Sequence, residues 1–194
     1  MKRFVMSCIV LGAIAAPACA ALNAGQSAPE FQAQASFAGK AAPYSLKDAL
    51  KKGPVVVYFY PSAYTSACNV QAREFAERSD KFAAAGASII GVSLDSIARL
   101  NEFSADPEYC NSKFPVASDA DGTIAKSYDL SVKQGRAGQK DSRGNDIGHD
   151  FAERTTFIVS PDGKIAATVG GVSPTANVEK ALEAVQALAA TRAK

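Results

Sequence analysis

Residues 55–82 decide the fold, and they read VVVYFYPSAYTSACNVQAREFAERSDKF. The first six residues are apolar and rich in β-branched and aromatic side chains, a composition that predicts a buried strand. Pro61 follows, and because proline has no N–H to donate to a neighbouring strand, it should end the strand. A turn of small and polar residues then leads to Cys68, and residues 69–78 predict a helix.

The predicted helix has an apolar face that carries Val70, Phe75 and Phe82, with charged residues on the opposite face. Cys68 therefore lies where a strand hands over to a helix N-terminus. Unpaired backbone N–H groups and the positive end of the helix dipole favour an anion there, and the thiolate is the reactive form of cysteine. We predict that Cys68 is a nucleophile; the alternative is a cysteine that only fills space in the core.

Beyond this stretch, apolar strands alternate with helices. The predicted strands are 88–94, 114–117, 155–160 and 165–169, and the predicted helices are 45–50, 97–103, 122–128 and 174–191. Residues 21–52 form an entry segment with weak alternation at 32–37. Such alternation predicts βαβ units and a mostly parallel sheet that is covered on both faces. We therefore expect a single α/β domain.

Residues 1–20 have the composition of a signal peptide. They hold a short basic start, an apolar core at 4–16 and an A-x-A cleavage site at 18–20. The apolar core is too short to span a bilayer as a helix. We predict cleavage and export to the periplasm or beyond, which leaves residues 21–194; the alternative is a lipid anchor on Cys19.

Cleavage changes the balance of charge and the number of cysteines. The leader holds two of the 21 basic residues and none of the 19 acidic ones, so 21 less 2 leaves 19 of each sign. A formally neutral chain has no electrostatic reason to bind nucleic acid or an anionic membrane surface. Cys68 and Cys110 remain, and two cysteines in an oxidising compartment would by number alone favour a structural disulfide.

Residues 131–153 differ from the rest of the chain because they combine glycines and charges with few apolar side chains. We predict an exposed polar loop, inserted between two elements of the domain. His149, the only histidine, lies in this loop. A lone histidine in a polar loop is most often solvated, so we predict neither a catalytic role nor a metal site for it. No cofactor is predicted.

Four motifs in order along the chain resemble those of the peroxiredoxins of the AhpC/TSA superfamily. Pro61-x-x-x-Thr65-x-x-Cys68 resembles the active-site signature, and Gln71 resembles the bacterioferritin-comigratory-protein, or peroxiredoxin Q, branch. The other matches are 93–95 with 114–119, and 154–159 with the turn at 161–163. The similarity covers residues 24 to 190, nearly all of the chain that follows the leader.

The resemblance implies a thioredoxin-like fold, with a central mixed β-sheet flanked by helices. It also implies a thiol-dependent peroxidase that reduces hydrogen peroxide and organic hydroperoxides through a sulfenic acid on Cys68. Thr65 would direct its hydroxyl at the peroxide or the thiolate, although a helix N-cap is its ordinary role. Arg154 would hold the thiolate and polarise the peroxide, and Pro61 would shield Cys68 from solvent.

The resolving step departs from the commonest pattern, since Arg73 stands where many members of this branch carry a second cysteine. The resemblance to other members implies Cys110 as the resolving thiol, in an intramolecular disulfide that a thioredoxin-like or other thiol reductant recycles. A disulfide needs Cα atoms within about 7 Å, so the turn at Cys68 and residues 107–112 would have to unfold locally.

Three alternatives remain open at this point. Cys110 could be a bystander in a one-cysteine enzyme, the protein could be a redox sensor without turnover, or both cysteines could form a structural disulfide in a non-catalytic secreted domain. The absence of Cys-x-x-Cys disfavours a thioredoxin-type oxidoreductase. The resemblance implies a monomer.

Overall fold

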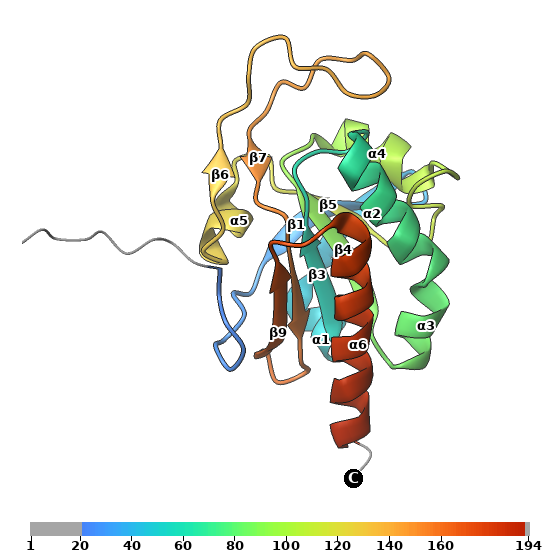
Figure 1. The fold of residues 1–194 in the computed structure, drawn as a ribbon, viewed down its shortest axis with the longest axis vertical. Coiled ribbons are helices and arrows are strands. Elements are labelled where there is room, and N and C mark those ends of the chain that lie inside the picture. The colour runs from blue at the N-terminus through green and yellow to red at the C-terminus, as the bar shows by residue number, and fades with distance from the viewer. Residues whose placement is uncertain (1–20, 193–194) are drawn as a thin grey trace, which may run out of the picture.

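The structure is a computed structural model that describes residues 21–192, so the predicted leader lies outside the described residues. The strands are β1 (Gln32–Phe37), β2 (Lys40–Ser45), β3 (Val55–Phe59), β4 (Ser88–Ser93), β5 (Val116–Ser118), β6 (Val132–Lys133), β7 (Phe151–Ala152), β8 (Thr155–Val159) and β9 (Ile165–Gly170). The helices are α1 (Leu46–Leu50), α2 (Ser66–Glu77), α3 (Ser79–Ala84), α4 (Ile97–Ala105), α5 (Thr123–Ser127) and α6 (Pro174–Arg192). Figure 1 shows the main sheet with helices on both faces.

The main sheet is mixed. Its seven strands lie in the order β2-β1-β5-β4-β3-β8-β9. The pairs β3–β4 and β4–β5 are parallel, and the other four pairs are antiparallel. The mixed sheet implied by the resemblance is confirmed, whereas the mostly parallel sheet predicted from alternation was wrong. The reason is that β1–β2 and β8–β9 are joined by tight turns, which force antiparallel pairing.

Each face of the sheet carries its own core, and β3 contributes to both. Val56 and Tyr58 point to one face, and Val57 and Phe59 to the other, all at most 1% exposed. Helices α2, α3, α4 and α6 pack on the first face, and α1 and α5 pack on the second. A strand buried on both faces reads as a continuous apolar run, which is why the sequence predicted β3 well.

One close approach fixes α2 over the sheet. Gly91 of β4 lies against the Tyr58 ring, and a Cβ on Gly91 would sit 2.7 Å from ring atoms of Tyr58. The Tyr58 ring in turn stacks on Phe75 of α2, with centroids 4.5 Å apart. The missing side chain of Gly91 therefore makes room for the ring that positions the helix of Cys68.

Two predictions about α2 were wrong in detail. The helix begins at Ser66, three residues earlier than predicted. Val70 is 44% exposed and does not face the core. The buried residues of α2 are Cys68, Gln71, Ala72, Phe75 and Ala76. They repeat every three to four positions from Cys68, and this places Val70 on the solvent side.

The predicted polar loop is a hairpin-like excursion. Strands β6 and β7 pair at its base, and Figure 1 shows the chain between them reaching over the end of the sheet towards α4. Lys140 pairs with Asp146 near its tip. Asp141 and Ile147 are buried, so the loop is packed against the domain in part.

Candidate active site around Cys68

Cys68 is the third residue of α2 and is 2% exposed. The first hydrogen bond of the helix runs from Asn69 N to Thr65 O, at 2.8 Å. The N–H groups of Ser66, Ala67 and Cys68 therefore have no partner within the helix, and they point towards its N-terminal end. This end is electrically positive, and the sulfur of Cys68 lies in this first turn.

Arg154 contacts the sulfur directly. Its Nη2 donates to Cys68 Sγ at 3.2 Å, and its Nη1 donates to Gln71 Oε1. The sheet explains the position: Phe59 pairs with Thr155 in the antiparallel pair β3–β8, so Arg154 lies beside the residue that follows β3. The guanidinium thus meets the turn that carries Cys68 because two interior strands are in register. A permanent cation with several donors suits an anionic sulfur.

A buried polar network holds the guanidinium in place. Gln71 Nε2 donates to Asn177 Oδ1 at 2.9 Å, and Thr156 Oγ1 donates to the same oxygen at 2.6 Å. Asn177 Nδ2 donates to Val169 O at 2.9 Å. Gln71, Thr156 and Asn177 are at most 1% exposed. The network ties Arg154 to α2, β8, β9 and α6, so its orientation is fixed by the fold.

Two residues of this network, Asn177 and Thr156, were not predicted as site residues from the sequence. One feature of the sequence pointed to Asn177. It is a polar residue on the side of the last helix that also carries the buried residues Val178 and Ala181. A buried polar side chain needs a hydrogen-bond partner, so its position already indicated a contact with another polar group.

Thr65 and Pro61 shape the turn before α2. Thr65 is the N-cap residue, but its side chain does not cap the helix; its Oγ1 donates to Ser62 O at 2.9 Å. The hydroxyl oxygen keeps its lone pairs, so it can accept a hydrogen bond from a bound hydroperoxide. Pro61 lies half-buried just beyond β3, where it ends the strand.

Cys110 lies in the turn between α4 and β5 and is fully buried. Burial raises the pKa of the Cys110 thiol well above its usual range, and Asp106 raises it further. Both Cys68 and Cys110 are free thiols. Arg73 packs against this turn, since its Nε donates to Glu108 O at 2.8 Å.

The structure also builds a polar cluster beside the turn, around Asp95. This carboxylate is fully buried. It accepts from Ala63 N at 2.7 Å, Ser93 Oγ at 2.7 Å, Ser62 Oγ at 3.0 Å and His149 Nε2 at 2.8 Å. The prediction that His149 is simply solvated was wrong, because a loop histidine and a strand-end aspartate 54 residues apart meet in the fold.

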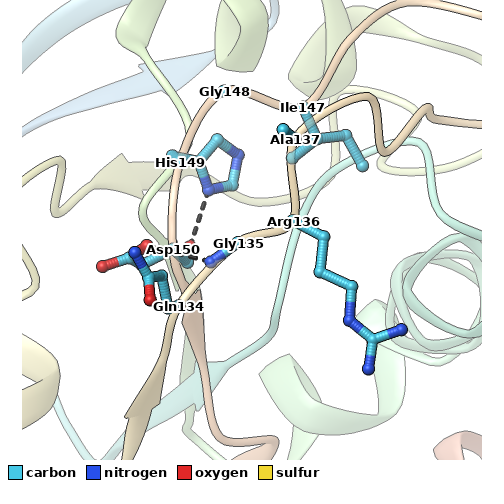
Figure 2. Close-up of a pocket in the computed structure, with 8 residues that line it drawn as sticks. All are labelled: Gln134, Gly135, Arg136, Ala137, Ile147, Gly148, His149 and Asp150. Atoms are coloured by element: carbon cyan, nitrogen blue, oxygen red, sulfur yellow. Dashed lines mark hydrogen bonds between the residues drawn. The ribbon is translucent and has the colours of Figure 1, made fainter.

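His149 uses both ring nitrogens. Its Nδ1 lies 2.7 Å from Asp150 O, and Figure 2 shows this contact, with Gly135 and Arg136 on the opposite arm of the loop. The two arms line a pocket of about 240 Å³. Burial disfavours the imidazolium, but the hydrogen bond and charge of Asp95 outweigh it and raise the pKa of His149. Burial also disfavours the carboxylate of Asp95, yet His149 lowers the Asp95 pKa.

Two further observations concern residues 21–192 only. In that range, no three or more His, Cys, Asp and Glu side chains are grouped so as to hold a metal ion. Within the same range, no helix has both the length and the apolar composition needed to cross a bilayer.

A free thiol in the first turn of a helix, in contact with a guanidinium, lies on a mixed sheet flanked by helices, an arrangement typical of cysteine-based redox proteins. The chain belongs to the AhpC/TSA family, whose match covers residues 24–168. Members of this family are peroxiredoxins, so the protein is an oxidoreductase that reduces peroxides with electrons from a thiol.

Similar proteins agree with this assignment. The chain is 32% identical over 147 residues to a putative peroxiredoxin of Mycobacterium tuberculosis, covering 75% of this chain and 86% of the relative. The crystal structure of peroxidoxin BcpB from Mycobacterium tuberculosis matches with TM-score 0.71 and 28% identity, over 86% of this chain and 98% of that one. Bacterioferritin comigratory protein from Xanthomonas campestris, studied for alkyl peroxide reduction, matches with TM-score 0.63 and 28% identity, over 80% and 91%. The thioredoxin-like fold is thereby confirmed.

The first prediction from this geometry concerns Arg154→Lys. Lysine keeps the positive charge, but its single ammonium lacks the planar fork that contacts Cys68 and Gln71 together. Losing a preorganised donor at a reacting centre lowers rates by about 100-fold or more; because the charge remains, we expect about 10- to 100-fold slower oxidation of Cys68. Competition with a haem peroxidase for hydrogen peroxide measures this rate.

The matched control is Arg136→Lys, since Arg136 is exposed in the loop and the same substitution there should leave the oxidation rate unchanged. Equal rates for Arg154→Lys and the unmodified protein would show that the guanidinium geometry is irrelevant to the reaction.

The second prediction concerns stability and pH. The raised pKa of His149 means that its bond to Asp95 stabilises the fold fully below the unfolded pKa of about 6.5, and that this stability is lost as pH rises through the folded pKa. His149→Gln should therefore lower the free energy of unfolding by up to about 2 kcal/mol at pH 5.5, and by less at pH 9. Urea unfolding at several pH values measures the difference. A difference that stays constant with pH would contradict the ionic contact.

Proposed function

We propose that Cys68 is the peroxidatic cysteine, that Cys110 resolves its sulfenic acid, and that a thioredoxin-like reductant recycles the disulfide. The observation that carries this proposal is the 3.2 Å contact from Arg154 Nη2 to Cys68 Sγ at the N-terminus of α2. A guanidinium that contacts the sulfur favours the thiolate and also faces the space where a peroxide would react.

The first step is an attack of the Cys68 thiolate on one peroxide oxygen. An S–O bond forms and the O–O bond breaks, so sulfur is oxidised to the sulfenic state and the second oxygen leaves as water or an alcohol after taking a proton. Arg154 and the free N–H groups of the first turn of α2 stabilise the charge on sulfur and on the departing oxygen. The hydroxyl oxygen of Thr65 accepts a hydrogen bond from the O–H group of the bound peroxide.

We infer that both hydrogen peroxide and organic hydroperoxides are substrates. The bacterioferritin comigratory protein of Xanthomonas campestris has alkyl peroxide reduction activity. In this chain the first turn of α2 presents Ala67, which is exposed and has only a methyl side chain, so an alkyl group has room beside the sulfur.

The second step joins the two cysteines. The Cys110 thiol attacks the sulfenic sulfur of Cys68, a disulfide forms, and the hydroxyl group leaves as water with the thiol proton. Cys110 lies in a turn rather than in a helix or strand, and the two residues that follow it have left-handed φ values of 49° and 53°. Because Cys110 is fully buried, the second step requires this turn to open locally. A dithiol reductant then returns two electrons and becomes oxidised itself.

The test uses one equivalent of peroxide and intact mass spectrometry. The unmodified mature protein should lose about 2 Da and yield a peptide crosslink between Cys68 and Cys110. Cys110→Ser should gain about 16 Da as a sulfenic acid at an unchanged first-step rate. Cys68→Ser should consume no peroxide and keep its free energy of unfolding.

Each other outcome identifies one of the alternatives. A persistent sulfenic or sulfinic Cys68 beside a free Cys110 indicates a one-cysteine enzyme. Peroxide oxidation without turnover in the presence of thioredoxin indicates a sensor. Similar loss of stability in both serine variants indicates a structural disulfide, and undiminished turnover by Cys68→Ser rules out the proposed nucleophile.

We also propose that the protein is exported and that residues 1–20 are removed. The A-x-A sequence at 18–20 supports cleavage there. Shortly after this site, Leu22 is buried, and its carbonyl accepts from Thr168 Oγ1 at 2.6 Å.

Expression in a Gram-negative host tests this proposal. The periplasmic fraction should contain a chain that begins at Ala21 by mass, and Ala20→Glu should accumulate the uncleaved form because the cleavage site needs small residues. Full-length protein confined to the cytoplasm would refute export, and an acyl group on Cys19 would show a lipid anchor instead.

A further inference from the structure

The turn before α2 is held from outside by two different segments. We call residues 62–64 the catalytic turn. Ala63 N donates to Asp95 Oδ2 at 2.7 Å, and Ala63 O accepts from Arg99 Nη2 at 2.9 Å. Ser62 Oγ donates to Asp95 Oδ1 at 3.0 Å. These contacts come from the end of β4 and from α4, and they fix the first half of the turn.

The second half is held by the polar loop. We call residues 139–149 the strap. Ser142 N and Ser142 Oγ both donate to Tyr64 O, each at 2.8 Å. The Arg143 guanidinium lies 3.3 Å from the centroid of the Tyr64 ring, which is a close cation–π contact. The strap therefore contacts both the backbone and the side chain of Tyr64.

The strap is itself anchored on α4. The Asp141 carboxylate is fully buried, accepts from Arg143 N and Asn145 N at 2.8 and 2.9 Å, and pairs with Arg99 at 2.7 Å. Arg143 also pairs with Glu102 of α4 at 2.8 Å. These contacts close the strap into a tight turn and seat it on the helix, so its hold on Tyr64 is preorganised.

The backbone conformation of Tyr64 is one that requires support from the surrounding residues. Its φ is 59°, a left-handed conformation that is rare for a bulky side chain and is kept only where the surroundings over-determine it. Tyr64 is four residues before Cys68. If the contacts of Tyr64 were lost, the backbone would relax towards negative φ and the start of α2 would move with it.

We propose that Ser142 and Arg143 of the strap are positioning residues that hold the catalytic turn folded and so set the rate at which oxidised Cys68 leaves its site. The inference rests on the proposed function, in which Cys68 must reach Cys110. A tight hold favours the first oxidation, and it prolongs the sulfenic acid in place. A second peroxide can then oxidise that sulfur to the sulfinic acid and leave as water or alcohol. The strap thus decides between resolution and over-oxidation.

The test compares Arg143→Ala with Lys140→Ala in the mature protein. Both substitutions remove one positive charge from the strap, but the Lys140 ammonium donates to Asp146 and Gly144 O, both within the strap, and not to Tyr64. Arg143→Ala should raise hydrogen exchange in peptides that contain the catalytic turn by about three- to tenfold. The rate of disulfide formation should rise by a similar factor, and the sulfinic fraction under excess peroxide should fall. Lys140→Ala should behave as the unmodified protein does.

A second, milder variant distinguishes loosening of the catalytic turn from a general loss of the fold. Ser142→Ala removes one of two hydrogen bonds to Tyr64 O and leaves the backbone bond in place, so it should give the same changes at smaller size. Unchanged exchange in the catalytic turn of both strap variants, beside an intact fold, would overturn the inference. Faster exchange in a protein that never forms the disulfide would support the hold on the turn, and would show that the Cys110 step alone is wrong.

Discussion

The contact between the Arg154 guanidinium and the Cys68 sulfur is the constraint on which the rest of the site depends. A sulfur that is 2% exposed loses most of its hydration, so an anion there needs donors supplied by the protein. Arg154 is such a donor, and its own position needs an acceptor, which is Gln71. Gln71 in turn needs Asn177. Each buried polar group requires a hydrogen-bond partner, and the series of contacts ends at a backbone carbonyl of β9.

The fold meets these needs through strand register and ring packing. Arg154 reaches the sulfur because β3 and β8 are paired with Phe59 opposite Thr155. Cys68 faces Arg154 because Tyr58 stacks on Phe75 of the same helix. A slip of one residue between β3 and β8 would turn every side chain of β8 to the other face of the sheet. The chemistry therefore rests on the most buried part of the structure, where register is specified most strongly.

The sequence predicted the local parts of this arrangement and missed the long-range ones. Strand β3, the position of Cys68 at a helix start and the turn between β8 and β9 follow from short patterns, and the structure contains all three. Val70 was misplaced because an apolar residue alone does not state which face it occupies. The roles of His149 and Asn177 depend on partners 54 and 106 residues away, Asp95 and Gln71. No local pattern encodes such a pair, although a polar residue on an apolar helix face is a signal that a partner exists.

Cys68 is positioned by Arg154 and its buried network on one side, and by the catalytic turn with the strap on the other. These two supports differ in kind, and the difference suits a reaction in two steps. On one side, Arg154 belongs to a buried network that is at most 1% exposed beyond the guanidinium, and it should persist unless the core unfolds. On the other side, the strap holds Tyr64 of the catalytic turn through hydrogen bonds and one ring contact, and a partly exposed ion pair joins Arg143 to α4. Contacts of the second kind are individually weak, so they can break while the sheet remains intact. In the reaction proposed above, peroxide attack requires a fixed geometry around sulfur, whereas disulfide formation requires that sulfur to leave its site. A site with one rigid and one releasable support would meet both requirements, and the polar composition of residues 131–153 supplies contacts of the releasable kind.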